Sequence, residues 1–318
     1  MFPATFRVRP QPMHFPTVAL IGRYNDAGIS QPLLTLARML QDAGRTVLFE
    51  AETAANTGVS SYRAATTGEI GATASLAIVM GGDGTMLGAA RRLAPFNVPL
   101  VGINHGRVGF ITDIRLPDAV SAVQQLLDGR YEQEERVLLT GTVRRGAETL
   151  YTAQALNDVV LSRAGRGGMI EMQVEVDGET MATMRADGLV IATPTGSTAY
   201  ALSANGPILH PALRGTVLVP VSPQTLSNRP IVLPDSCSIE VVLTSTGRVE
   251  AGASAHFDMQ TWSQLAEGDR IIVERAPHTI RFLHPIGYSY YATLRQKLNW
   301  NRMPSEPDGE YPCGSEQA

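Results

Sequence analysis

Residues 76–85 read LAIVMGGDGT, and this stretch decides which class of fold the chain adopts. Its first five residues are apolar and predict a buried strand, whereas the glycines predict a tight turn. Residues 86–94 then predict a helix. A turn between a strand and a helix lies at the carboxyl end of the strand, where open α/β sheets bind ligands.

This glycine-rich turn is suited to binding a phosphate, because glycine opens the backbone and the following helix directs unpaired N–H groups at the anion. The predicted phosphate contacts are Gly81, Gly82, Gly84 and Thr85. Asp83, between the glycines, is the predicted catalytic residue, since a carboxylate beside phosphates can act as general base or as a metal-side ligand. A plain turn in which Asp83 caps the helix is the structural alternative.

The residues on either side of the turn predict a doubly wound α/β domain. Apolar, strand-like runs alternate with helical patterns: strands at Thr17–Gly22, Thr46–Glu50 and 98–103, and helices at 29–43 and 118–127. Strands that are separated by helices form parallel sheets. Residues 14–135 are therefore predicted to form a domain that binds nucleotide phosphates, completed by a C-terminal helix at 288–300.

Residues 136–287 predict a β-rich, sandwich-like domain. Strand signals dominate this part, at 137–143, 156–162, 171–176, 180–185, 189–193, 216–220, 239–244, 270–274 and 279–283. Asp177-Gly178 lies between two alternating runs and predicts a tight hairpin. One helix is predicted near 197–204, and the proline- and glycine-rich residues 303–318 predict a disordered tail.

Composition excludes several classes of function. Of the 318 residues, 44% are apolar and 18% are charged, and the net charge is −4. These values predict a globular cytoplasmic protein that binds neither nucleic acid nor a membrane. Lys297 is the only lysine, which excludes a P-loop and a protein-kinase site because both need a lysine at the phosphates. Backbone amides, arginine and a divalent metal would have to bind phosphates instead.

Two further motifs carry polar groups that suit a nucleotide. Asn157 and Asp158 stand together at the edge of an apolar strand, where an amide and a carboxylate can bind a vicinal diol. A strand-end turn is the alternative for this pair. Residues 185–203 lead from a strand through TPTGSTAY into a short helix, and they supply hydroxyls, open amides and the aromatic ring of Tyr200.

These motifs resemble those of the NAD kinase family. GGDGT is shared by NAD kinases, diacylglycerol and sphingosine kinases and, in a close variant, phosphofructokinases, whereas DGLVIATPTGSTAY at 187–200 is similar to NAD kinases alone. The resemblance covers about residues 17–300 and includes NHGRVGF at 104–110 and LSNRP at 226–230. The sequence departs from the family pattern at Asp158, where glutamate is commoner, and at Met259, where a glycine usually precedes the glutamine.

The resemblance implies a bacterial ATP-NAD kinase, which transfers the γ-phosphoryl group of ATP to the 2′-hydroxyl of the adenosine ribose of NAD to give NADP. It implies Mg²⁺ held mainly by the ATP phosphates, and a homodimer or homotetramer. A lipid kinase of the same superfamily and a non-catalytic NAD(P)-sensing protein are the alternatives. The implied NAD-binding residues are Asp83, Gly84, Asn157, Asp158, Arg185, Asp187, Thr198, Ala199, Tyr200, Ala201, Leu202, Ser203 and Gln260.

Overall fold

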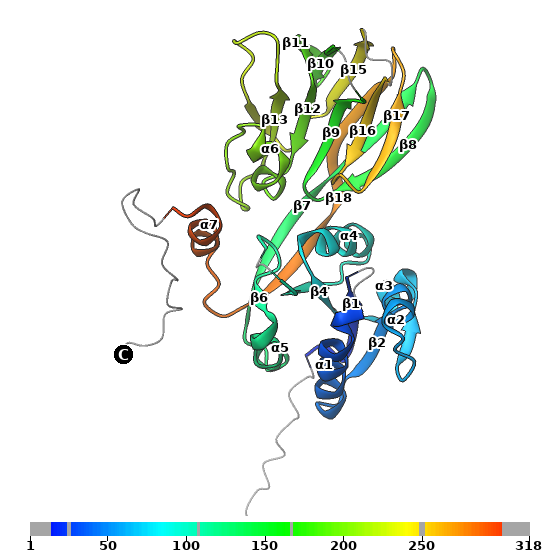
Figure 1. The fold of residues 1–318 in the computed structure, drawn as a ribbon, viewed down its shortest axis with the longest axis vertical. Helices are drawn as coiled ribbons and strands as arrows, with labels where there is room; N and C mark the ends of the chain where they lie inside the picture. The colour runs from blue at the N-terminus through cyan, green and yellow to red at the C-terminus, as the bar shows by residue number, and fades with distance from the viewer. Residues whose placement is uncertain (1–13, 24–26, 107–108, 166–167, 248–251, 301–318) are drawn as a thin grey trace, which may run out of the picture.

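The computed structural model describes residues 14–23, 27–106, 109–165, 168–247 and 252–300. An α/β lobe built from the first part of the chain adjoins a β-rich lobe built from the second part (Figure 1). This arrangement confirms the predicted fold class. Within these residues, no helix is both long enough and apolar enough to cross a membrane.

Five parallel strands form the sheet of the α/β lobe, in the order β3-β2-β1-β4-β5. They are β1 (Thr17–Gly22), β2 (Thr46–Glu50), β3 (Arg63–Ala65), β4 (Leu76–Gly81) and β5 (Leu100–Asn104). All residues of β4 and β5 are buried, as expected when helices cover both faces of a parallel sheet. Strands β2 and β3 lie on one side of β1, whereas β4 and β5 lie on the other. Doubly wound sheets bind ligands at this change of direction, between β1 and β4.

Helices cover this sheet because their apolar residues recur at helical spacing. In α1 (Ser30–Asp42), the buried face consists of Leu33, Leu36, Ala37 and Leu40. The lobe also contains α2 (Ala51–Thr57), α3 (Thr67–Thr73), α4 (Asp83–Leu93), α5 (Ala119–Leu127) and 3-10 turns at Ala27–Ile29, Ala94–Phe96 and Leu116–Asp118. Helix α4 begins at Asp83, before the predicted start at residue 86, so the glycine-rich turn forms its N-terminus.

The β-rich lobe contains a six-stranded antiparallel sheet, in the order β14-β13-β12-β9-β16-β17. Its strands are β9 (Asp158–Arg163), β12 (Gly188–Ala192), β13 (Gly215–Val221), β14 (Ile231–Pro234), β16 (Ala253–Phe257) and β17 (Thr261–Leu265). A shared apolar core joins it to β10 (Ile170–Val176), β11 (Glu179–Ala186) and β15 (Ile239–Ser245). The hairpin predicted at Asp177-Gly178 is confirmed, because both residues have the positive φ of a type I′ turn, 51° and 82°.

Two long antiparallel strands, β7 (Tyr131–Arg145) and β18 (Arg270–Pro285), run from one lobe into the other (Figure 1). Strand β18 pairs with β15 in one lobe and with β5 in the other, so a single twelve-stranded sheet passes through both. The strands β8 (Glu148–Ala155) and β6 (Ile114–Arg115) extend it. The predicted domain boundary at 135/136 falls inside β7, and that division stays a prediction.

The last described element is α7 (Tyr290–Leu298), which confirms the helix predicted at 288–300. The Ser289 hydroxyl caps it by accepting the Ala292 N–H at 3.2 Å. The helix predicted near 197–204 is a 3-10 turn at Gly196–Thr198 followed by the short α6 (Tyr200–Ser203). The predicted disordered tail at 303–318 lies outside the described residues.

Phe282 tests how much the shared sheet contributes to stability. It lies opposite Leu100 at the junction of β18 and β5 and is 1% exposed. Phe282→Ala should lower the free energy of unfolding by about 3–5 kcal/mol, because it removes a buried ring and leaves a cavity. The control Val120→Ala, at a 42% exposed position on α5, should change it by about 0.5 kcal/mol or less. Urea denaturation followed by circular dichroism measures both, and equal losses would contradict the prediction.

Candidate functional site

A cavity of about 660 Å³ opens at the carboxyl ends of β1, β2, β4 and β5. The glycine-rich turn forms one wall, where Gly82, Gly84 and Thr85 of the predicted phosphate contacts line the space. Gly81 is buried behind this wall, and a Cβ there would lie 2.5 Å from Thr85 Oγ1. Gly81 therefore makes room for the Thr85 side chain, while its neighbours face the cavity.

The opposite wall is polar, and sequence analysis did not identify it. Glu50, at the end of β2, is 5% exposed, and its carboxylate accepts hydrogen bonds from Thr53 Oγ1 at 2.8 Å and Arg92 Nη2 at 2.6 Å. Arg23 and Glu52 line the same space. The sequence nevertheless indicates Glu50 as a site residue, because it ends an otherwise apolar strand at the ligand-binding edge of the sheet.

The carboxylate of Asp83, in the first turn of α4, points toward the loop that follows β5. Its Oδ2 accepts from the Phe110 N–H at 2.8 Å, and its Oδ1 accepts from the Ile111 N–H at 3.3 Å and the Thr112 hydroxyl at 2.9 Å. Gly109 permits this approach, since a Cβ there would overlap Asp83 Oδ1. The loop that the family motif indicated thus holds this carboxylate in place.

An ion pair joins α4 to the hairpin between β16 and β17. Arg91 Nη1 lies 2.8 Å from Asp258 Oδ2, and Arg91 Nη2 donates to Gln260 Oε1 at 2.6 Å. Gln260 in turn donates to the Gly84 carbonyl at 2.7 Å, so this predicted NAD ligand reaches the glycine-rich turn. Met259, which replaces the usual glycine, is exposed and has a φ of 54°. The turn therefore forms with a side chain at this position, and Gln260 still reaches the cavity.

Asp258 also holds the predicted diol-binding pair, a role that sequence analysis did not assign to it. Its carboxylate accepts the N–H groups of Leu156 at 3.1 Å, Asn157 at 2.7 Å and Asp158 at 3.2 Å. Burial raises the pKa of Asp258, while Arg91 and these N–H donors act in the opposite direction and favour the ionised carboxylate. The helix after the glycine-rich turn and the segment that carries Asn157 are therefore held against each other through Asp258.

Asp158 is buried. It is 2% exposed, and its Oδ1 has no hydrogen-bond partner in the part of the chain that the structure describes. Burial and, secondly, the negative charge of Asp258 raise the pKa of Asp158 to about 7. A carboxyl with this pKa changes charge near neutral pH, so it can either donate to or accept from a sugar hydroxyl.

The predicted TPTGSTAY run packs directly on Asn157. The Thr193 N–H donates to the Asn157 carbonyl at 2.9 Å, and a Cβ at Gly196 would overlap that same oxygen. Gly196 therefore lets two backbone segments touch. The predicted NAD-binding residues that follow range from fully buried (Ala201) through half-buried (Thr198, Ala199, Tyr200 and Leu202) to exposed (Ser203).

Arg185 and Asp187, predicted to bind NAD, lie apart from Asn157 within this chain. Asp187 precedes β12, whereas Asn157 packs against the turn that follows β12, a separation of about 20 Å along the strand. Asp187 instead pairs with Arg163 at 2.6 Å, and Arg185 with Glu171 at 3.1 Å. A whole strand thus separates the two motifs within one chain, and the assignment of Arg185 and Asp187 to NAD binding stays a prediction.

The protein combines a glycine-rich turn, which can bind phosphates without a lysine, with an adjoining segment that carries the amide of Asn157 and the carboxyl of Asp158. In a two-lobed chain, these features define a phosphotransferase that acts on nucleotides. Two family models match the chain: the ATP-NAD kinase N-terminal domain at residues 18–131 and the ATP-NAD kinase C-terminal domain at residues 156–285. The chain belongs to the NAD kinase family.

Curated relatives match nearly the full length. The chain is 67% identical to the NAD kinase of Bordetella parapertussis, over 93% of this chain and 99% of that protein, and 53% identical to that of Paraburkholderia phytofirmans, over 94% and 98%. A crystal structure of yeast NADH kinase complexed with NADH superimposes with a TM-score of 0.83 at 21% identity, covering 95% of each chain. An NAD kinase from Archaeoglobus fulgidus in complex with ATP gives 0.68 at 22% identity, covering 89% of this chain and 98% of that one. These two structures confirm the fold.

The raised pKa of Asp158 predicts that the stability of the protein depends on pH. Its pKa of about 7 exceeds the value of about 3.9 in an unfolded chain, so the folded protein keeps a proton that the unfolded chain releases. This contribution to stability is present below about pH 4 and is lost as the pH rises to about 7. Asp158→Asn removes the effect, so the Tm of the variant relative to wild type should be higher at pH 8 than at pH 5.

Differential scanning calorimetry at the two pH values provides the measurement. Asp42→Asn, the same substitution at an exposed position of α1, should show no such change with pH. A difference between Asp158→Asn and wild type that stays constant from pH 5 to pH 8 would contradict the raised pKa.

Proposed function

We propose that this chain transfers the γ-phosphoryl group of ATP to the 2′-hydroxyl of the adenosine ribose of NAD, which gives NADP. The observation that carries the proposal is the Arg91–Asp258 connection, which links the helix after the glycine-rich turn to the Asn157–Asp158 segment and supports a site that includes both. The curated relatives at 53–67% identity are NAD kinases. The complexes of the two solved relatives, one with NADH and one with ATP, support ATP as the donor and a nicotinamide dinucleotide as the acceptor.

The ATP phosphates lie against the turn formed by Gly82, Gly84 and Thr85, and Arg92, near the end of the same helix, supplies positive charge to the cavity in place of a lysine. The cavity also offers hard oxygen ligands. Asn104 Oδ1 is buried without a hydrogen-bond partner among the described residues, and the Glu50 carboxylate lines the same space. Such donors fit Mg²⁺, which would be held mainly by the ATP phosphates and would neutralise their charge when bound.

Asp83 acts as the general base. Its carboxylate has about four lone-pair positions, and the three donors from the loop leave one for the 2′-hydroxyl of the ribose. As the hydroxyl oxygen attacks the γ-phosphorus, its proton passes to Asp83, the new O–P bond forms, and the bond to the β-phosphate oxygen breaks to release ADP. Asn157 and Asp158 orient the ribose for this attack.

The site is completed in a homo-oligomer, a homodimer or a homotetramer, in the cytoplasm. Two observations support this part of the proposal. Within one chain the whole of β12 separates Asp187 from the turn that packs on Asn157, so a second copy that supplies Arg185 and Asp187 would complete the site. Large apolar side chains are also exposed at and near the edge strand β14, among them Leu226 at 81% and Val232 at 42%.

Replacing Asp83 tests the catalytic assignment. Asp83→Asn should slow NADP formation from NAD, ATP and Mg²⁺ by about 10²–10⁴-fold, because the variant lacks a proton acceptor. NAD binding, measured by isothermal titration calorimetry, should stay within about threefold. Turnover at the wild-type rate would refute the role of Asp83, and phosphorylation of diacylglycerol with no NADP formed would refute the proposed substrate.

Gly109→Ala tests the loop that holds Asp83 without changing the carboxylate itself. The added methyl would overlap Asp83 Oδ1 and lie 2.5 Å from Thr112 Oγ1, so the carboxylate must move. We expect kcat for NADP formation to fall roughly 100-fold, as for other misplaced catalytic groups. Gly68→Ala, where nothing lies within 4 Å of the new Cβ, should keep the wild-type kcat. Equal kcat values for the two variants would show that the loop does not position Asp83.

A further inference from the structure

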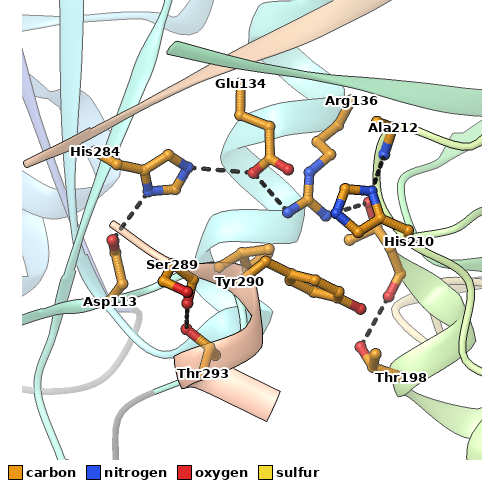
Figure 2. Close-up of polar contacts among 12 residues, drawn as sticks. Asp113, Glu134, Arg136, Thr198, His210, Ala212, His284, Ser289, Tyr290 and Thr293 are labelled. Atoms are coloured by element: carbon orange, nitrogen blue, oxygen red, sulfur yellow. Dashed lines mark hydrogen bonds and ion pairs between the residues drawn. The ribbon is translucent and has the colours of Figure 1, made fainter. Parts of the chain in front are cut away.

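Charged side chains, two of them buried and two partly buried, form a series of contacts between the two lobes (Figure 2). His284 Nδ1 lies 2.9 Å from Asp113 Oδ2, and His284 Nε2 lies 3.3 Å from Glu134 Oε2. The same Glu134 oxygen accepts a hydrogen bond from Arg136 Nη2 at 2.7 Å. Because His284 and Arg136 are 2% and 3% exposed, water screens these charges little.

The geometry favours the protonated form of His284. Each ring nitrogen faces a carboxylate oxygen, through a hydrogen bond to Asp113 and an ion-pair contact with Glu134, and only the imidazolium carries hydrogen on both nitrogens. Burial by itself would lower the pKa of His284, but the contacts with the two carboxylates outweigh it and raise the pKa above its usual value.

Other groups near His284 do not replace its charge. Tyr288 stacks on the imidazole with a centroid distance of 3.8 Å, and burial raises its pKa, so it stays neutral. Burial also raises the pKa of Tyr290. Arg136 contacts Glu134 rather than Asp113. With His284 protonated, the two carboxylates and the two cations balance; without that proton, one negative charge is left in the interior.

One end of the series lies next to the loop that holds Asp83. Asp113 directly follows Thr112, whose hydroxyl donates to the Asp83 carboxylate. The second carboxylate oxygen of Asp113, Oδ1, is buried without a hydrogen-bond partner among the described residues. The position of Asp113 therefore depends on its contact with His284.

The other end of the charged series lies behind the segment that carries Asn157 and Asp158. Arg136 Nη1 donates to Thr195 Oγ1 at 2.9 Å, within the TPTGSTAY turn. The next residue, Gly196, packs against the Asn157 carbonyl. The charged series thus adjoins the loop that holds Asp83 at one end and contacts the turn that packs on Asn157 at the other.

We propose that His284 is a positioning residue for phosphoryl transfer: as an imidazolium it fixes Asp113, and through the adjoining loop it orients Asp83. This inference rests on the proposed function and adds a residue to it. Loss of one His284 proton removes the positive charge that faces Asp113 and leaves a weaker, neutral hydrogen bond from Nδ1 in its place. Asp113 is then held less firmly, so the loop at 110–112 shifts and its donors no longer align with Asp83. Turnover then falls, whereas the cavity and the Asn157 edge still bind their ligands.

The pH dependence of kcat tests this role. In wild type, kcat should fall at alkaline pH in a step that reflects deprotonation of His284. His284→Gln should lower kcat at pH 7 by roughly 10–100-fold, change the KM for NAD and ATP by less than about threefold, and lose the alkaline step. His278→Gln, the same substitution at an exposed position of β18, should keep the wild-type profile. An unchanged kcat profile in His284→Gln would overturn the proposal.

A second variant separates positioning from a general loss of folding. Asp113→Asn removes one of the two carboxylates that raise the pKa of His284, so the alkaline step should move to lower pH. A step that stays in place would also overturn the proposal.

If wild type forms no NADP, the proposed function is wrong, but hydrogen exchange still decides the inference. The Phe110 and Ile111 amides should exchange faster in His284→Gln than in wild type, and equal rates would refute it.

Discussion

The buried carboxylate of Asp258 is the constraint on which the rest of the site depends. A charge removed from water must be matched by a counter-charge and by N–H donors, and Asp258 finds them on separate segments: Arg91 on α4 and the amides of residues 156–158. The segment with the glycine-rich turn and the segment with Asn157 are thereby held against each other. Moving either one would leave a buried charge unpaired, which commonly costs about 3–5 kcal/mol.

Close backbone packing explains several of the motif glycines. Three of them leave room for a neighbouring group: Gly81 for Thr85, Gly109 for the Asp83 carboxylate, and Gly196 for the Asn157 carbonyl. Gly82 and Gly84, in contrast, line the cavity itself. The glycine pattern that characterises the family therefore reflects the assembly of the site as much as contact with a ligand, because a side chain at any of the three packed positions would displace its neighbour.

Local sequence patterns predicted the parallel sheet, the glycine-rich turn and the hairpin at Asp177-Gly178, because each depends on residues adjacent in the chain. They did not predict α2, β3 and α3, which are short and carry few buried residues. Nor could they reveal the pairing of Arg91 with Asp258, since no spacing indicates a contact between residues so far apart in the sequence. The distance between Asp187 and Asn157 was not apparent for the same reason: a motif that is continuous in sequence is divided by a strand in space.

Strands β7 and β18 pair along nearly their whole length while they cross from one lobe to the other. Many phosphotransferases close over their substrates by rotating two domains about a flexible linker. Here the ladder has one irregularity, where the register shifts between Arg275 and Thr279, and on either side of it a rotation of the lobes would have to shear paired backbone. The paired strands thus limit how far the two lobes can turn against each other, and the short segments at the cavity mouth are the parts of the chain that this pairing leaves free to admit substrates and exclude water.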